Sequence, residues 1–228
     1  VPQADIQRAK DTLRISYGHT SHGSQLTTGM TPLDAFMQTR WGTPAGLYTW
    51  TDGGTGDTLD IDDRAMAGDV GYYPQWVNET RAYLNNPAHS ACNVIIWSWC
   101  GQASGYTQQT MIDRYLAPMN QLETDYPNVR FVYMTGHLDG GGATGNLNLR
   151  NQQIRDYCTA NDKILYDFAD IESYDPDGLT HYMPLLCNDD CDYDSDGNGS
   201  RDRNWATDWQ AAHPGDWYSC SAAHSRPL

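Results

Sequence analysis

The chain is organised around one stretch, which reads Leu13-Arg14-Ile15-Ser16-Tyr17-Gly18-His19-Thr20-Ser21-His22-Gly23-Ser24-Gln25. Its first half predicts a short apolar strand, and its second half predicts a tight turn between two glycines. In α/β proteins, side chains that carry out chemistry lie in such turns at the carboxyl ends of strands. Ser21 is therefore the candidate nucleophile. The alternative is that Ser21 or Ser24 merely caps the helix that follows.

The rest of the chain predicts strands that alternate with helices. Continuous apolar runs of the kind seen in fully buried strands lie at 93–99, 129–135 and 163–168. Helices are expected at 4–12, 74–86, 107–125 and 147–161, and a further helix is expected to begin at Thr31 with Pro32 in its first turn. Residues 41–73 are rich in Gly, Thr and Asp and read as a long irregular region. The alternation predicts a single domain over 1–228, a three-layer α/β/α fold with a parallel sheet.

Composition excludes several classes of partner. The chain has 228 residues and is 39% hydrophobic, which is enough for one globular core. Its net charge of −15 argues against nucleic acid and against an anionic membrane surface. The sequence holds no apolar run long enough to insert into a bilayer. Its 15 Tyr and 8 Trp suit a surface that meets sugars or a partner protein, including a second copy of the chain.

Six cysteines, an even number, predict up to three disulfides and a secreted, extracellular setting. The lack of a signal peptide fits a mature secreted chain. Cys187 and Cys191 are close enough in sequence to bridge locally. Cys92 and Cys100 flank one predicted strand, so an extended chain would hold them too far apart for a bridge. Six cysteines allow fifteen pairings, and the connectivity stays open.

An acidic loop at about 187–204 carries the strongest local motif. Three aspartates alternate and a glycine, Gly197, follows, as in the first half of a D-x-D-x-D-G calcium loop. The expected Ca²⁺ ligands are Asp192, Asp194, Asp196, Asn198 and Asp202. Position twelve is Arg203, where an EF-hand has Glu, so a structural calcium loop of another type is expected. The alternative is a solvated acidic loop without an ion.

The order of the polar motifs resembles the SGNH, or GDSL-like, hydrolase superfamily. Gly18-His19-Thr20-Ser21 is similar to the G-D-S block of that family, with one residue inserted and His in place of Asp. Gly54 is the nearest match to the oxyanion-hole glycine, and Gln102 stands after a buried strand where the family has Asn. Ser221-Ala222-Ala223-His224 is similar to the last block, D-x-x-H, but has Ser in place of the acid.

This resemblance implies a flavodoxin-like fold and hydrolysis of an ester, such as an acetyl group on a carbohydrate. Ser21 would be the nucleophile and His224 the base, with an oxyanion hole made by the N–H groups of Ser21 and Gly54 and the amide of Gln102. Two aspartates, Asp177 and Asp216, are candidates for the missing triad acid. His181, which follows Asp177, is an alternative base.

The sequence also allows a metal site and a function without catalysis. His19, His22 and His137 follow predicted strands and are expected to line a cleft, where they could also hold a metal ion. Alternatively, the domain has no catalytic activity and serves as an extracellular binding, adhesion or filament subunit that calcium and disulfides stabilise. A buried Ser21 would favour this second function class.

Overall fold

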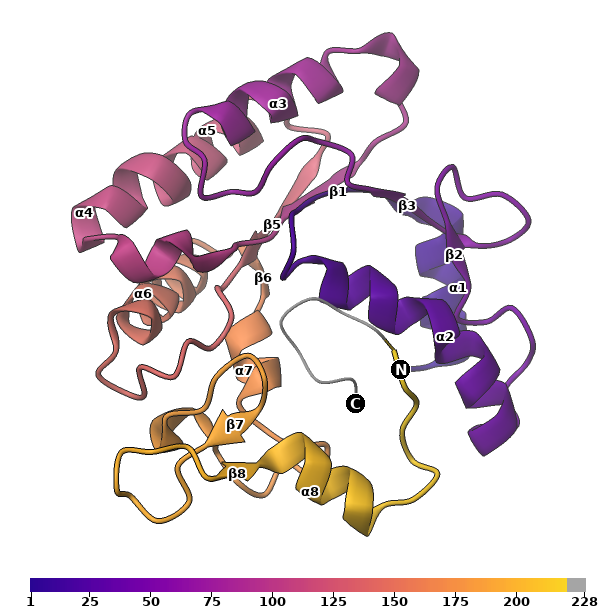
Figure 1. Cartoon of the computed structure of the whole chain (residues 1–228). Helices are drawn as coiled ribbons and strands as arrows, with labels where there is room; N and C mark the ends of the chain where they lie inside the picture. Colours follow the sequence, from indigo (N-terminus) through magenta and orange to yellow (C-terminus); the bar gives the residue numbers. More distant parts are fainter. Residues whose placement is uncertain (221–228) are drawn as a thin grey trace.

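A computed structural model describes residues 1–220 of the chain, and it has a parallel sheet at its centre. The six strands follow the order β2-β3-β1-β4-β5-β6, with each neighbouring pair parallel (Figure 1). Their bounds are β1 Arg14–Gly18, β2 Trp50–Thr51, β3 Leu59–Asp63, β4 Val94–Trp97, β5 Arg130–Met134 and β6 Ile164–Tyr166. Helices flank the sheet, so the expected three-layer α/β/α arrangement is confirmed.

The helices connect these strands and extend the chain beyond them. Their bounds are α1 Gln3–Thr12, α2 Ser24–Trp41, α3 Gln75–Leu84, α4 Gln108–Met111, α5 Ala117–Asp125, α6 Asn146–Ala160, α7 Phe168–Glu172 and α8 Trp205–Ala212. Shorter turns are η1 Pro87–His89, η2 Gly101–Gly105 and η4 Met183–Leu185, and a π-helical turn, η3 Ile112–Leu116, joins α4 to α5. A two-stranded antiparallel ribbon, β7 Asp192–Tyr193 with β8 Arg203–Asn204, lies near the end of the described chain.

The strand order defines where a ligand is expected. Without the short edge strand β2, the order is that of a doubly wound sheet. The chain passes from β1 to β3 on one side and then crosses to β4, β5 and β6 on the other side of β1. The switch point lies between β1 and β4, and ligands of such sheets bind beyond the carboxyl ends of the two strands. The turn that contains Ser21 follows β1 at this edge.

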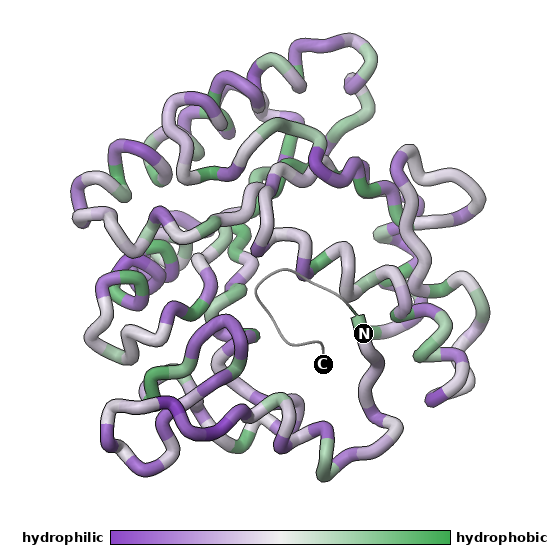
Figure 2. Tube along the Cα trace, in the orientation of Figure 1, coloured by the Kyte–Doolittle hydropathy of each residue, from purple (hydrophilic) through white to green (hydrophobic). Residues whose placement is uncertain are grey.

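The main core lies between β4 and β5 and the helices α3, α5 and α6. Trp97 of β4 is fully buried, and its indole N–H donates to Thr80 Oγ1 of α3 at 2.9 Å. Trp99 is also buried and donates to the carbonyl of Met134 at 2.9 Å. A second, smaller apolar cluster involves Leu138, Tyr182 and Trp205. The loop between β7 and β8 is mostly hydrophilic (Figure 2).

Two sequence predictions need correction. Helix α2 begins at Ser24 and not at Thr31, and Pro32 lies inside it. The hydroxyl of Thr31 donates to the carbonyl of Thr27 at 2.9 Å, one turn earlier in the same helix. The region expected to be irregular, 41–73, contains β2 and β3, and β3 lies in the interior of the sheet.

The expected disulfides are absent from the structure. All six cysteines are free thiols, and Cys187 and Cys191 lie unbridged in the smaller apolar cluster. The prediction of an extracellular setting was based on these disulfides, and the structure does not support it. Within residues 1–220, no helix is long and apolar enough to cross a membrane.

Candidate functional site at the carboxyl edge of the sheet

The turn after β1 presents Ser21 at the switch point. Ser21 is partly exposed and lines a pocket of about 370 Å³ with His19, Thr20 and residues of the loop after β3. A Cβ atom on Gly23 would lie 2.3 Å from both His19 Cβ and Ser98 Oγ, so only glycine fits where this turn crosses the end of β4. Helix α2 has Gly23 as its N-cap and no side-chain cap, so Ser21 does not serve as a cap.

A buried aspartate, Asp69, joins three loops at this edge. Its carboxylate accepts hydrogen bonds from Thr20 Oγ1 at 2.8 Å, the N–H of Gly71 at 2.9 Å and Gln102 Nε2 at 3.4 Å. The residue is 1% exposed, so these donors replace the water that its charge would otherwise need. Gln102 is thus linked through Asp69 to Thr20, in the turn that carries Ser21, and its amide nitrogen has a second hydrogen.

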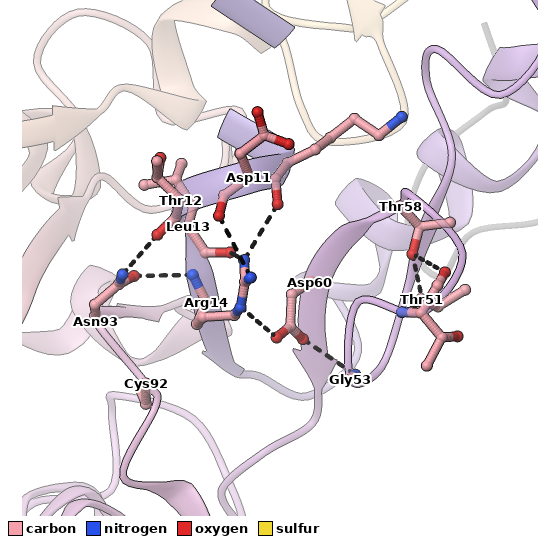
Figure 3. Close-up of polar contacts among 12 residues, drawn as sticks. Asp11, Thr12, Leu13, Arg14, Thr51, Gly53, Thr58, Asp60, Cys92 and Asn93 are labelled. Carbon is pink, nitrogen blue, oxygen red and sulfur yellow. Dashed lines mark hydrogen bonds and ion pairs between the residues drawn. The ribbon is translucent and has the colours of Figure 1, made fainter. Parts of the chain in front are cut away.

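The prediction for Gly54 is wrong because this residue lies at the opposite edge of the sheet. Gly54 lies in the turn before β3, against Asp60, and Asp60 is the register partner of Arg14 at the start of β1. Figure 3 shows this amino edge, where Asp60 contacts both Arg14 and the N–H of Gly53. Five residues of β1 separate this edge from the turn that contains Ser21.

The glycine-containing loop at the correct edge follows β3. It carries Gly68, which lines the pocket beside Ser21, and Gly71. A Cβ atom on Gly71 would lie 2.3 Å from Gln102 Cδ, so this loop and the loop after β4 meet through a contact that requires glycine. Sequence reasoning missed this loop because β3 was not recognised as a strand.

Three side chains from distant loops form a connected set behind Ser21. Cys100, just after β4, has its Sγ 3.4 Å from His22 Nδ1, and His22 Nε2 lies 2.7 Å from Asp189 Oδ2. Ser21 Oγ lies 3.8 Å from the same sulfur. Burial opposes the charge on Asp189, but the hydrogen bond from His22 and the charges of His22 and His137 outweigh it, and the pKa of Asp189 falls below its ordinary value.

His137 lies directly over His22. Their rings are stacked with centroids 3.8 Å apart and an angle of 5° between the planes. His137 Nδ1 is 2.7 Å from the carbonyl of Leu138, while its Nε2 is buried without a hydrogen-bond partner among the described residues. Burial, followed by the proximity of His22, lowers the pKa of His137, so this ring is neutral at pH 7.

The group His22, His137 and Asp189 has ligand atoms within 4.8 Å of one another. The two parallel rings nevertheless fit a metal ion poorly. An ion shared equally by them would lie about half their 3.8 Å separation outside each ring plane, whereas imidazole binds metals in its own plane. His19 does not join this group, because its two ring nitrogens contact Asp63 Oδ1 and the carbonyl of Thr20, each at 2.8 Å.

The two candidate triad acids, Asp216 and Asp177, bind other residues. Asp216 forms an ion pair with Arg40, near the end of α2, whereas Ser21 precedes the start of that helix. An α-helix rises 1.5 Å per residue, so this separation is roughly 24 Å. Asp177 accepts a hydrogen bond from Trp209 Nε1 at 3.1 Å, and the exposed ring of His181 stacks on Tyr174. His224 lies outside the described residues.

The aspartates of the acidic loop bind the loop's own backbone. Asp194 is 4% exposed and accepts the N–H groups of Gly197 at 2.8 Å, Asn198 at 3.2 Å and Gly199 at 2.8 Å. The backbone N–H of Gly199, then those of Gly197 and Asn198, outweigh burial and lower the pKa of Asp194. Asp202 accepts the N–H of Ser195 at 2.8 Å. These bonds account for part of the acidic pattern without an ion, and calcium binding stays a prediction.

Comparison with known proteins adds little to this site. No protein-family model and no curated protein matches the chain. Among solved structures, TubZ of the Clostridium botulinum phage c-st is similar at a TM-score of 0.35 and 16% identity, over 71% of this chain. The chain spans 53% of that protein, about half its length. A similarity this low bears on neither fold nor function.

Proposed function

We propose that the protein is a serine hydrolase that acts on esters, with Ser21 as the nucleophile. The observation that carries this proposal is the position of Ser21 at the carboxyl edge of the switch point, in a pocket that the glycine loop after β3 also lines. Gln102 is linked to the neighbouring Thr20 through Asp69. Ser21 is partly exposed beside a pocket of about 370 Å³, which gives an acyl group access to its hydroxyl. An exposed nucleophile on a glycine-containing turn is the arrangement that acyl transfer needs.

Each of the residues has a role in the proposed reaction. Ser21 Oγ attacks the ester carbonyl, and His224 takes its proton and returns it to the leaving alcohol. The N–H of Ser21 and the second hydrogen of the Gln102 amide stabilise the developing oxyanion. A glycine of the loop after β3 takes the place first expected for Gly54. Water then releases the acid. An acetyl ester on a carbohydrate is the proposed substrate class.

The first test is hydrolysis of p-nitrophenyl acetate by the full chain and by Ser21→Ala. We expect the variant to lose activity by about 10⁴-fold or more, because the hydroxyl forms the covalent intermediate. His224→Gln should lose activity to a similar degree. Ser104→Ala removes an exposed hydroxyl from η2 at the same edge and serves as the matched control that stays active. A fluorophosphonate should label the peptide that contains Ser21.

Two results would overturn this assignment. Ser21→Ala that hydrolyses the ester as fast as the parent protein would exclude Ser21 as the nucleophile. A folded parent protein that neither hydrolyses esters nor takes up the fluorophosphonate would favour the binding or filament subunit instead.

We also propose that the acidic loop binds calcium, with Asp192, Asp194, Asp196, Asn198 and Asp202 as the residues that supply oxygen ligands. Ca²⁺ should then raise the melting temperature, since an ion that binds the folded state stabilises it by mass action. At 100 times the dissociation constant the gain is about 2.7 kcal/mol. Asp194→Asn should remove this response, whereas Asp5→Asn in α1 should leave it intact. Equal melting temperatures with Ca²⁺ and with a chelator would contradict the proposal.

A further inference from the structure

We infer that Cys100, His22 and Asp189 form a second nucleophilic centre beside Ser21, in which the Cys100 thiolate attacks electrophilic carbon. The compounds it would take are acyl thioesters and alkylating agents. The inference concerns the same edge of the sheet as the proposed function but does not depend on it. Its basis is a thiol, an imidazole and a carboxylate in series, contributed by three loops.

The geometry assigns a role to each member of the series. Asp189 Oδ2 is 2.7 Å from His22 Nε2, so a proton on Nε2 is shared with the carboxylate and Nδ1 is left as an acceptor. Nδ1 faces Cys100 Sγ at 3.4 Å, within the reach expected of a sulfur hydrogen bond. The imidazole can therefore take the thiol proton, and the carboxylate stabilises the imidazolium that forms. This order of nucleophile, base and orienting acid is the one that activates catalytic cysteines.

The surroundings of Cys100 and His22 favour the ion pair of thiolate and imidazolium. The His22 side chain is buried, with a residue exposure of 6%, so solvent screens the attraction between thiolate and imidazolium only weakly. His137 stacks on the His22 ring and fixes its plane. Cys100 is partly exposed just after the end of β4. Cys158, which is buried within α6 in the main core, has no such imidazole and carboxylate beside it among the contacts of the described residues.

Other ionisable groups face this centre. The charges of Asp189 and Asp139 oppose the fall in the pKa of His137, and the half-buried Glu172, whose Oε1 is buried, lies near Asp189. Burial keeps His137 neutral and raises the pKa of Glu172 to about 8, so neither adds a charge at pH 7. Asp189 is therefore the anionic partner that directly contacts His22 at this pH.

The covalent step balances without any additional reagent. With a thioester, the sulfur of Cys100 forms a bond to the carbonyl carbon and the carbon–sulfur bond of the substrate breaks. The departing thiolate takes the proton that His22 Nδ1 received from Cys100. Water then attacks the acyl-cysteine while His22 accepts a proton from it. The carbon–sulfur bond to Cys100 breaks, the acid is released, and His22 returns the proton to the Cys100 thiolate.

The test is alkylation by iodoacetamide at pH 6 to 9, with the modification of each cysteine followed by peptide mass spectrometry. An ordinary thiol has a pKa of about 8.5 and is mostly protonated at pH 7. We expect Cys100 to react at pH 7 at least about tenfold faster than Cys92, whose pKa burial raises. His22→Gln and Asp189→Asn should each slow Cys100 by about tenfold and leave Cys92 unchanged.

The outcomes separate this centre from the serine hydrolase. Ser21→Ala should leave the alkylation of Cys100 intact even where it abolishes ester hydrolysis. If Cys100 reacts no faster than Cys92, or if His22→Gln and Asp189→Asn leave its rate unchanged in folded protein, the centre does not exist. Unchanged near-UV circular dichroism of the two variants is the check that they are folded.

Discussion

Replacing Gly18 with alanine should destabilise the protein by about 3 kcal/mol, because the new methyl group has no space. A Cβ atom at this position would lie 2.4 Å from Trp97 Cε3, far inside van der Waals contact. Gly18 and Trp97 are register partners on the adjacent strands β1 and β4, so the two backbones cannot separate without breaking the sheet. Trp97 is fully buried and bonded to Thr80, so its ring cannot turn away without losing that hydrogen bond.

Urea unfolding followed by far-UV circular dichroism measures this effect. Gly29→Ala is the matched control, since Gly29 lies inside α2 and a Cβ atom there would contact nothing within 4 Å. Alanine in a helix interior is favoured over glycine by about 1 kcal/mol, so the control should be as stable as the parent or more so. Two variants of equal stability would show that the contact between Gly18 and Trp97 is not tight.

The alternation of strands and helices could be predicted from the sequence, but the pattern of β3 does not identify it as an interior strand. Leu59-Asp60-Ile61-Asp62-Asp63 alternates apolar and acidic residues, which hid an interior strand. Its carboxylates bind groups that come from other elements: Asp60 contacts Arg14, Asp62 accepts from Tyr83, and Asp63 contacts His19. A charged strand next to β1 is therefore stable because of partners that local periodicity cannot reveal.

The candidate site also has parts that could be predicted from the sequence and parts that could not. Ser21 and Gln102 could be placed at one edge because each follows a predicted strand, and carboxyl ends of parallel strands meet. The pairing of His22 with Asp189 could not be predicted, since 167 residues separate them and the acidic loop that contains Asp189 indicated only a calcium site. Cys100 had a usable signal, its position after a buried strand, but it was considered only as a disulfide partner. Gly54 was placed at the wrong edge because the glycine-containing loop that does lie there could be predicted only once β3 was recognised as a strand.

Glu172, whose carboxyl group is buried, should make stability depend on pH in a direction opposite to that of most carboxylates. Burial raises its pKa from 4.5 to about 8, while one oxygen accepts the N–H of Leu138 at 2.6 Å and the other, Oε1, has no partner among the described residues. Between these two pKa values the folded state holds a proton that the unfolded state has lost. Stability therefore falls as pH rises, by about 1.4 kcal/mol per pH unit.

Glu172→Gln removes this dependence, because an amide does not ionise and its oxygen can still accept the N–H of Leu138. We expect the stability of the variant relative to the parent to rise by about 3 kcal/mol between pH 5 and pH 7.5. Urea unfolding of both proteins at several pH values measures the difference, in which the other titrating groups cancel. Parallel curves would mean that Glu172 is ionised in the folded state. A neutral Glu172 leaves Asp189 as the negative charge beside His22, so this measurement also tests the electrostatics on which the Cys100 centre depends.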